Sequence, residues 1–285
     1  MNDITMEIGS SKIQHGTDSD RIYLMHLDAG DLPEIIGDLE DMAEKHGYSK
    51  IFAKVPEDAA HKFEEAGFKR EAEVPGFYGQ GAHKGVFMGR FLKDQRAEEA
   101  QPEVVQKYIQ LARDKADSPA KQPSEDEFDF LELGPDDAEE MAEVYKEVFP
   151  IYPFPIHDPD YLRETMETHV RYFGARRRHD GGKLVAIASA EMDREHGYVE
   201  MTDFATLPEQ RGKGLATFLL VRMEEAMQDE PITTCFTIAR ALSAGMNITF
   251  ARQGYEYAGT LTNNTGISGG IESMNVWYKP LGDGK

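Results

Sequence analysis

The sequence has little cysteine and tryptophan and no long apolar segment. One cysteine, Cys235, and one tryptophan occur among its 285 residues. A single cysteine forms no internal disulfide, and the apolar, strand-like surroundings of Cys235 favour a buried structural thiol over a nucleophile. The sequence shows no charged-then-apolar leader and no run of about eighteen apolar residues, the length that spans a bilayer. We therefore expect a cytoplasmic protein with no membrane partner.

Basic residues are scarce relative to acidic ones. The sequence holds 31 Lys and Arg against 52 Asp and Glu, a formal net charge of −21. This excess would repel nucleic acid phosphates over most of the surface, so we expect no nucleic acid partner. Hydrophobic residues make up 40% of the chain. That content suffices for one large core or two small ones, and we expect two domains.

The most informative segment is Glu200–Ala216, in which a short apolar run leads through a Pro turn into a Gly-rich helix start. Gly212 and Gly214 let the backbone approach a ligand closely, and the free N–H groups of a helix's first turn attract an anion such as pyrophosphate. The segment lacks the Lys-Ser/Thr pair of a P-loop and the third glycine of a dinucleotide fingerprint. Its order Arg211-x-x-Gly214-x-Ala216 resembles the coenzyme A signature of the GNAT acetyltransferases, Gln/Arg-x-x-Gly-x-Gly/Ala.

The flanking segments agree with that resemblance. Residues 199–206 predict a strand, and apolar residues recur at helical spacing from Leu215 to Met227. Residues 233–239 predict a second strand, and residues 243–253 a helix that Gly254 ends before an aromatic strand start. GNAT domains end in a similar way. The resemblance implies an α/β (α+β) GNAT fold with a central mixed, mostly antiparallel sheet and helices on both faces.

The chain divides into three predicted parts. Residues 127–285 form the catalytic GNAT domain in this interpretation. Residues 96–126 form a linker, partly helical because apolar residues recur at helical spacing over 101–116, with an extended break at Ser118–Pro123. Residues 1–95 form a separate N-terminal domain.

The N-terminal domain resembles a degenerate, truncated GNAT domain. Its Phe63-x-x-x-Gly67-Phe68 segment parallels Phe250-x-x-x-Gly254-Tyr255, with strand-like residues on each side. The segment Leu27–Pro33, where the coenzyme loop should lie, has neither the arginine nor the paired glycines, and its acidic residues would oppose a pyrophosphate. We expect a coenzyme-free domain that serves as a scaffold or forms a homodimer. An unrelated α/β module is the alternative.

The GNAT resemblance implies acetyl-coenzyme A as the acetyl donor and no metal. It assigns the pantetheine arm to the backbone of the strand end, at Phe204, Ala205 and Thr206. It assigns the pyrophosphate to the loop and helix start, at Arg211, Gly212, Lys213, Gly214, Leu215 and Ala216. Ser243, Asn247 and Phe250 complete the expected coenzyme-binding set. The alternative is a tight turn that carries two solvated cations.

Acetyl transfer to an amine requires an unprotonated amine and a means of protonating the thiolate. Glu200 occupies the position at which several GNATs carry their general base. Asp203 is the reserve base, because a regular strand would point it to the opposite face unless a bulge re-aims it. Many GNATs carry a tyrosine as proton donor where this chain has Phe250. Candidates that could replace it are Tyr255, Tyr257, Ser243 or solvent.

Two segments are expected to recognise the substrate, a small amine. Three prolines fix the aromatic loop Val148–Asp158, in which Tyr152, Phe154 and His157 could bracket an alkyl chain. A rigid packing loop capped by Asp158 is the alternative. The hairpin 261–277 carries polar residues where no core needs them. Of these we select Asn263, Glu272 and Asn275 as substrate-binding.

Four longer segments resemble one group of GNATs, the beta-lysine N-acetyltransferases. They are Tyr152–Pro159, Glu200–Pro208, Ala244–Ala251 and Ile271–Lys279. The resemblance implies acetylation of the epsilon amine of beta-lysine to give N-epsilon-acetyl-beta-lysine, a compatible solute. It suggests Glu272 for the beta-amine and Asn263 or Asn275 for the carboxylate. The alternatives are a protein or other small-amine N-acetyltransferase and a coenzyme A-binding sensor without catalysis.

Overall fold

The computed structural model describes residues 3–124, 126–267 and 269–282. Over these residues thirteen strands form one sheet in the order β1-β2-β3-β4-β6-β5-β12-β13-β11-β10-β9-β8-β7. The strands are β1 Ile4–Ile8, β2 Ser11–Gly16, β3 Arg21–His26, β4 Lys50–Pro56, β5 Lys69–Tyr78, β6 His83–Phe91, β7 Phe128–Leu133, β8 Val170–Arg177, β9 Lys183–Asp193, β10 Tyr198–Thr206, β11 Thr234–Arg240, β12 Glu256–Ile267 and β13 Gly270–Pro280. Among these strands only β3 with β4 and β10 with β11 pair in parallel. The prediction of a mixed, mostly antiparallel sheet is confirmed.

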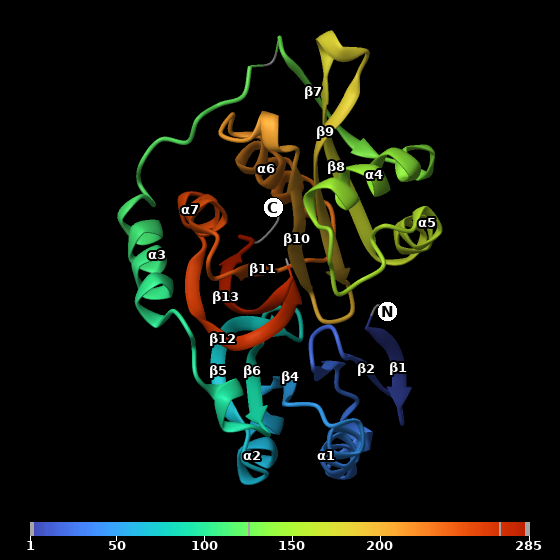
Figure 1. Ribbon diagram of the computed structural model, residues 1–285, viewed down its shortest axis with the longest axis vertical. Helices are drawn as coiled ribbons and strands as arrows, with labels where there is room; N and C mark the ends of the chain where they lie inside the picture. The colour runs from blue at the N-terminus through green and yellow to red at the C-terminus, as the bar shows by residue number, and fades with distance from the viewer. Residues whose placement is uncertain (1–2, 125, 268, 283–285) are drawn as a thin grey trace.

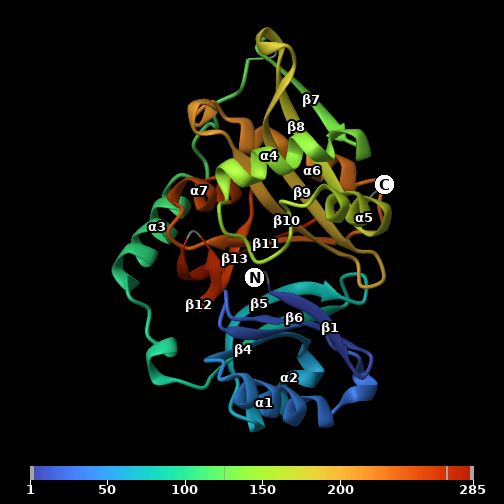
Figure 2. The same ribbon diagram turned by 45° about the vertical axis from the view of Figure 1, so that its right-hand side comes forward.

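Helices cover both faces of the sheet in the C-terminal half, which comprises β7 to β13. The helices are α1 Glu34–His46, α2 Glu57–Glu65, α3 Pro102–Asp114, α4 Ala138–Val148, α5 Pro159–Thr168, α6 Leu215–Met227 and α7 Ala244–Arg252. Strand β9 is buried at every position from Leu184 to Ala190, so its two faces are both covered. Helices α4 and α5 lie on one side of it and α6 lies on the other (Figure 2).

The helix ends follow from local sequence chemistry. The Asp158 carboxylate accepts a hydrogen bond from the Asp160 N–H at 3.0 Å, and Pro159 opens α5. Helix α7 ends at Arg252, and two residues later Gly254 adopts a left-handed φ of 80° that favours glycine. The expected helices at 101–116 and 243–253 are present with ends within two residues of those positions.

The N-terminal half, β1 to β6, repeats the topology of the C-terminal half (Figure 1). Strand order β5-β6-β4-β3-β2-β1 corresponds to β12-β13-β11-β10-β9-β8, and α1 and α2 take the places of α6 and α7. Counterparts of β7, α4 and α5 are missing from its described residues. This half is therefore a truncated copy of the same topology, as expected. The boundaries 1–95, 96–126 and 127–285 remain predictions, and the first two and last three residues lie outside the described residues.

The two halves join edge to edge where β5 meets β12. Ala72 of β5 pairs with Gly259 of β12, and Lys50 donates to Glu71 at 2.7 Å and to the Thr262 carbonyl at 2.8 Å. An apolar cluster crosses this junction, in which the ring of Phe77 stacks on that of Tyr198 at 4.1 Å. The long linker helix α3 packs its Val105 and Ile109 against Ala241. Hence the halves share one continuous sheet and one apolar cluster, while each keeps a core of its own.

We also compared the described helices with the requirements for crossing a membrane. None of them combines the length and the apolar character that crossing a bilayer would require.

We expect Gly259→Ala to destabilise the junction. A Cβ at this position would lie 2.7 Å from the Ala72 Cα, a contact that requires the paired backbones to separate. Overpacking of this kind costs about 1 to 3 kcal/mol in the free energy of unfolding, measurable by urea denaturation. The control is Gly37→Ala on the exposed side of α1, where no atom lies within 4 Å of the added Cβ. Equal stability of the two variants would contradict the tight junction.

Candidate functional site

The parallel strands β10 and β11 separate midway along their length. They pair at Tyr198 with Thr234, Val199 with Cys235 and Glu200 with Phe236, yet they continue to Thr206 and Arg240. Beyond Glu200, the edge of β10 that faces β11 therefore has backbone groups outside the ladder. A cavity lies in this gap. An extended ligand can pair with such a free strand edge.

A bulge in β10 changes the direction of Asp203. The register between β9 and β10 shifts between Thr202 and Ala205, and Asp203 has a left-handed φ of 52°. Regular alternation would point Asp203 and Glu200 to opposite faces, but both line the same inner cavity described below. The bulge therefore brings both predicted acids to one site.

The outer cavity has a volume of about 540 Å³ and lies between the end of β10, the start of α6 and α7. Most predicted coenzyme-binding residues line it, namely Phe204, Thr206, Arg211, Gly212, Gly214, Leu215, Ala216, Ser243 and Phe250. Three others do not line it. Ala205 is buried, Lys213 pairs with Glu127, and the side chain of Asn247 bonds the Arg240 and Ser243 carbonyls.

The loop before α6 has the shape expected of an anion cradle. Gly212 and Gly214 adopt left-handed φ values of 74° and 87°, and α6 begins directly afterwards. A Cβ at Gly214 would collide with the Lys121 carbonyl, so this glycine is required by the fold as well as by any ligand. Lys121 donates to the Gly212 carbonyl at 2.9 Å and lines the outer cavity. This linker lysine was not predicted from the sequence.

The inner cavity, about 90 Å³, lies between the two halves and borders the outer cavity at Tyr152, Thr202 and Asp203. Its ionisable lining residues other than tyrosine are Arg21, Lys54, His169, Glu191, Glu200 and Asp203. The aromatic loop contributes Tyr152 and Phe154, as predicted. The N-terminal half is thus more than a scaffold, because it supplies part of the wall of this cavity.

The aromatic loop is held in place from both sides. Gln14 of the N-terminal half donates to the Pro153 carbonyl at 3.0 Å. The His157 ring lies 2.7 Å from the Phe149 carbonyl oxygen and does not line the inner cavity. We therefore see His157 as a residue that braces the loop while Tyr152 and Phe154 face the cavity.

The acids of the inner cavity have shifted pKa values. Burial raises the pKa of Glu200 to about 8. Burial also raises the pKa of Asp203, against the opposing effect of hydrogen bonds donated by Ser189 at 2.6 Å and by Tyr152. Although burial would raise the pKa of Glu191, its contact with His169 lowers it. Glu200 can therefore change protonation state near neutral pH.

Three polar residues predicted to bind substrate lie elsewhere on the hairpin. Glu272 forms a two-pronged ion pair with Arg240, and Asn275 donates to Asn247 at 2.8 Å. Asn263 donates to the carbonyls of Arg96 and Glu98 in the linker. A register shift between Leu261 and Thr265 turns the next residue, Asn264, toward the inner cavity. This register shift was not visible in the sequence, and because of it Asn264 lines the inner cavity in place of the predicted Asn263.

The three candidate proton donors lie at different positions relative to the outer cavity. Ser243 lines the outer cavity, whereas the Tyr257 hydroxyl contacts Thr260 at 2.6 Å away from it. Tyr255 is buried against the far side of Phe250, and its ring lies outside the lining of the outer cavity. Of the three, only Ser243 is positioned to reach a ligand there.

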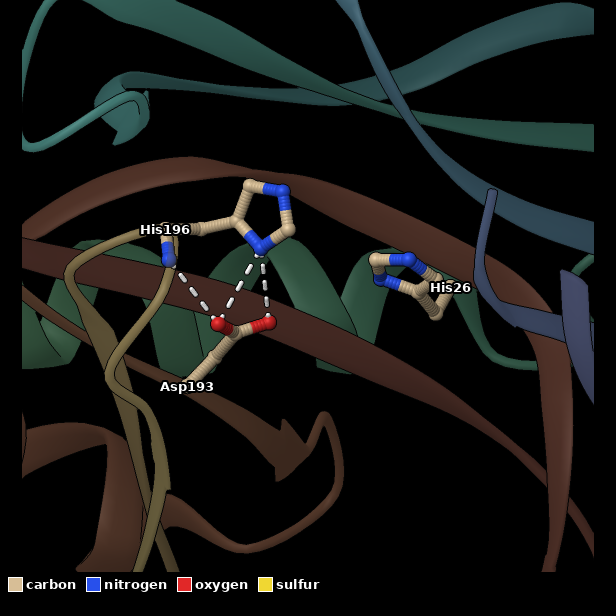
Figure 3. Close-up of side chains that lie close together, drawn as sticks. All are labelled: His26, Asp193 and His196. Carbon is tan, nitrogen blue, oxygen red and sulfur yellow. Dashed lines mark hydrogen bonds and ion pairs between the residues drawn. The ribbon is translucent and has the colours of Figure 1, made fainter. Parts of the chain in front are cut away.

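A third cavity, about 340 Å³, is lined in part by His26 and Asp193, which form a cluster with the neighbouring His196 (Figure 3). Their potential ligand atoms lie within 4.8 Å of one another. The His196 Nδ1 contacts both Asp193 carboxylate oxygens at 3.0 and 3.1 Å, and the His26 ring lies 5.3 Å from that of His196. The arrangement is a carboxylate–imidazole hydrogen bond that faces a second imidazole across the boundary between the halves.

Several lining residues of the inner cavity escaped the sequence analysis. Arg21 and Lys54 belong to the N-terminal half, Glu191 to β9 and Asn264 to β12. None belongs to a local motif, and the first two lie more than a hundred residues before the coenzyme signature. Arg21 and Lys54 reach the site because the two halves join where β5 meets β12.

Comparison with known proteins identifies the relatives of this chain. Residues 138–255 match the Acetyltransferase (GNAT) family. Over 274 residues the chain is 38% identical to the beta-lysine N(6)-acetyltransferase of Methanococcus maripaludis, which covers 96% of this chain and 97% of that protein. It is 32% identical over 269 residues to the N-acetyltransferase YodP of Bacillus subtilis, covering 94% and 95%. Among solved structures, the ribosomal-protein-S18-alanine N-acetyltransferase from Escherichia coli matches 54% of this chain and 94% of its own, with 16% identity and a TM-score of 0.46.

These similarities confirm the resemblance drawn from the motifs. Both full-length relatives exceed 30% identity, and the family match runs from α4 to the start of β12. That span includes the separated strands and the glycine loop that form the outer cavity. The chain belongs to the GNAT acetyltransferase family and is an N-acetyltransferase.

Proposed function

We propose that this protein transfers the acetyl group of acetyl-coenzyme A to the epsilon amine of beta-lysine, which yields N-epsilon-acetyl-beta-lysine. The observation that carries the proposal is the lining of the inner cavity. Three carboxylates, an arginine and a lysine line it together with side chains of the aromatic loop. Such a lining suits a small molecule with two ammonium groups and one carboxylate. The name of the Methanococcus relative points to the same substrate.

The outer cavity would hold the coenzyme. The free edge of β10 beyond Glu200 would pair with the pantetheine arm, and the N–H groups at the start of α6 would bind the pyrophosphate. Arg211 lines this cavity and would add a positive charge. The thioester would then lie near Tyr152 and Asp203, where the outer and inner cavities meet.

We assign the general base to Glu200. Its pKa of about 8 lies close to the operating pH, so its carboxylate can accept a proton from the ammonium group, directly or through water. Asp203 accepts hydrogen bonds from Tyr152 and Ser189, which stabilise its carboxylate and suit it to hold the ammonium group in place. The neutral amine then attacks the thioester carbonyl, and the carbon–sulfur bond breaks as the nitrogen loses its extra proton to solvent. The thiolate takes a proton from solvent, directly or through Ser243, which is reprotonated from solvent.

The size of the inner cavity supports a small amine over a peptide. Its volume of about 90 Å³, between the two halves and the prolyl loop, suits a small amine better than a polypeptide. The raised pKa of Glu200 favours catalysis over a silent coenzyme sensor, since a sensor needs no base with a pKa near neutrality.

The product suggests a physiological role. Acetylation removes one positive charge from beta-lysine and leaves a net-neutral zwitterion that can accumulate without a counterion. We propose that this product acts as a compatible solute in the cytoplasm, and the net charge of −21 is in keeping with a salt-rich interior.

Replacing Arg211 tests the coenzyme site. We expect Arg211→Ala to weaken acetyl-coenzyme A binding about three-fold to ten-fold in calorimetric titration, since one charge-assisted contact to phosphate is lost. The matched control is Arg222→Ala on α6, an exposed arginine that pairs with Glu225 and lies outside the cavity lining. Unchanged affinity in Arg211→Ala would contradict the placement of the pyrophosphate.

Replacing the two acids separates their roles. We expect Glu200→Gln to lower kcat at pH 7 by roughly 10² to 10⁴, the usual range for loss of a general base. The wild-type activity should rise with pH and level off near pH 8, because Glu200 must lose its proton to act as a base. In Glu200→Gln the bend in the pH profile should disappear. The deficit in kcat relative to wild type should shrink at high pH, because the substrate amine then loses its proton without a base.

Asp203→Asn is the matched comparison for Glu200→Gln. It should keep the bend near pH 8 and chiefly raise KM for the amine, since a carboxylate that holds the ammonium group is lost. A profile in which Asp203→Asn loses the bend and Glu200→Gln keeps it would transfer the role of base to Asp203.

Substrate choice is tested by isomers. We expect beta-lysine to exceed alpha-lysine in kcat/KM by about ten-fold to a hundred-fold, because shifting one amine by a carbon leaves a buried polar group unpaired at a cost of about 1 to 3 kcal/mol. NMR of the product should locate the acetyl group on the epsilon nitrogen. Equal efficiency, or acetylation of the beta-amine, would refute the substrate while leaving an N-acetyltransferase.

A further inference from the structure

Arg21 of β3 reaches the inner cavity from the N-terminal half with part of its guanidinium group unpaired. The side chain is 3% exposed. Its Nη1 donates to the Asn264 carbonyl at 2.7 Å and to the Thr265 hydroxyl at 3.1 Å. Its Nε is buried with no hydrogen-bond partner among the described residues. A donor that can serve a ligand therefore remains on this group.

Asn264 lies beside Arg21 and is also unpaired. It is 1% exposed, and neither its Oδ1 nor its Nδ2 has a partner within the described parts of the chain. Both residues line the inner cavity. Leaving a buried polar group without a partner costs about 1 to 3 kcal/mol, and buried polar groups in folded proteins are nearly always paired. Two such neighbours at one cavity wall indicate a missing polar ligand.

The charge on Arg21 indicates that this ligand is an anion. Burial lowers its pKa to about 10, so the guanidinium remains positive at neutral pH but lacks a carboxylate within ion-pair distance among the described residues. Both cations of the N-terminal half lie over the Tyr23 ring, the Arg21 Cζ at 5.1 Å and the Lys54 ammonium at 5.4 Å, but only Arg21 presents a planar group with several N–H donors. Arg21 is the better candidate for binding a planar anion.

We propose that Arg21 and Asn264 form a subsite that binds the carboxylate of the amine substrate, so that the N-terminal half selects amino acids over plain diamines. This inference rests on the proposed function. The guanidinium Nε–H and the Asn264 amide N–H would each donate to the carboxylate. The substrate would then lie with its carboxylate at Arg21 and its epsilon amine at Asp203, the end of the inner cavity that borders the outer one.

The experiment compares two substrates that differ only in the carboxylate. They are beta-lysine and 1,4-diaminopentane, which is beta-lysine without its carboxyl group. For beta-lysine we expect Arg21→Met to lower kcat/KM about ten-fold to a hundred-fold, the effect of losing a charge-assisted hydrogen bond. For 1,4-diaminopentane the same variant should change kcat/KM by less than about two-fold, because no carboxylate is present to lose the contact. Asn264→Ala should show the same selective loss to a smaller degree.

Arg96→Met is the matched control. Arg96 is also a buried arginine, 7% exposed, but it donates to the carbonyls of Asn263 and Ser19 and does not line the inner cavity. Its loss should affect both substrates equally. An equal loss for both substrates in Arg21→Met and in Asn264→Ala would show a merely structural role and overturn the inference.

Failure of the proposed function gives a different result. In that case wild-type protein would not acetylate beta-lysine at all, whatever residue stands at position 21. The ratio of kcat/KM between lysine and cadaverine, which differ by the same carboxyl group, then decides the inference. A ratio that Arg21→Met leaves unchanged would overturn it.

Discussion

The separation of β10 from β11 after Glu200 is the constraint on which the site depends. Two neighbouring parallel strands that stop pairing leave free backbone edges and an opening between them, which becomes the outer cavity. The bulge at Asp203 belongs to the same distortion, because the extra residue in β10 turns its carboxylate to the face that Glu200 occupies. The irregular strand β10 therefore carries both the free backbone edge at the outer cavity and the two acids Glu200 and Asp203.

The N-terminal half forms part of the wall of the inner cavity. It repeats the strand order of the C-terminal half, but the loop that should bind coenzyme is occupied by its own side chains. The Asp31 carboxylate accepts hydrogen bonds from the Ser10 N–H at 2.9 Å and the Ser11 hydroxyl at 2.7 Å. With that loop filled, the half contributes instead through β3 and β4, which place Arg21 and Lys54 opposite Glu200.

Charge burial at this boundary carries a cost in stability. Arg21 and Lys54 are buried, and Glu200 and Asp203 are half-buried. Charges in such a place are tolerated only when they are paired or when binding compensates. Some are satisfied within the protein, as Asp203 is by Ser189 and Tyr152. The Arg21 Nε and the Asn264 side chain, which lack partners among the described residues, are tolerated because the continuous sheet and the shared apolar cluster hold the halves together. Binding of a charged substrate would then recover part of that cost.

The sequence by itself determined what local rules govern. The glycines at 212 and 214, the helix start at Leu215, the Asp158 cap and the Gly254 helix end are decided within a few residues, so the fold and the coenzyme loop were predictable. Tertiary structure alone decided the rest. Register shifts in β10 and β12 direct Asp203 and Asn264, and not Asn263, toward the inner cavity. Strand pairing across the two halves brings Arg21 and Lys54 to the same cavity. A bulge reverses side-chain direction and an edge-to-edge junction joins distant segments, and neither leaves a pattern in neighbouring residues.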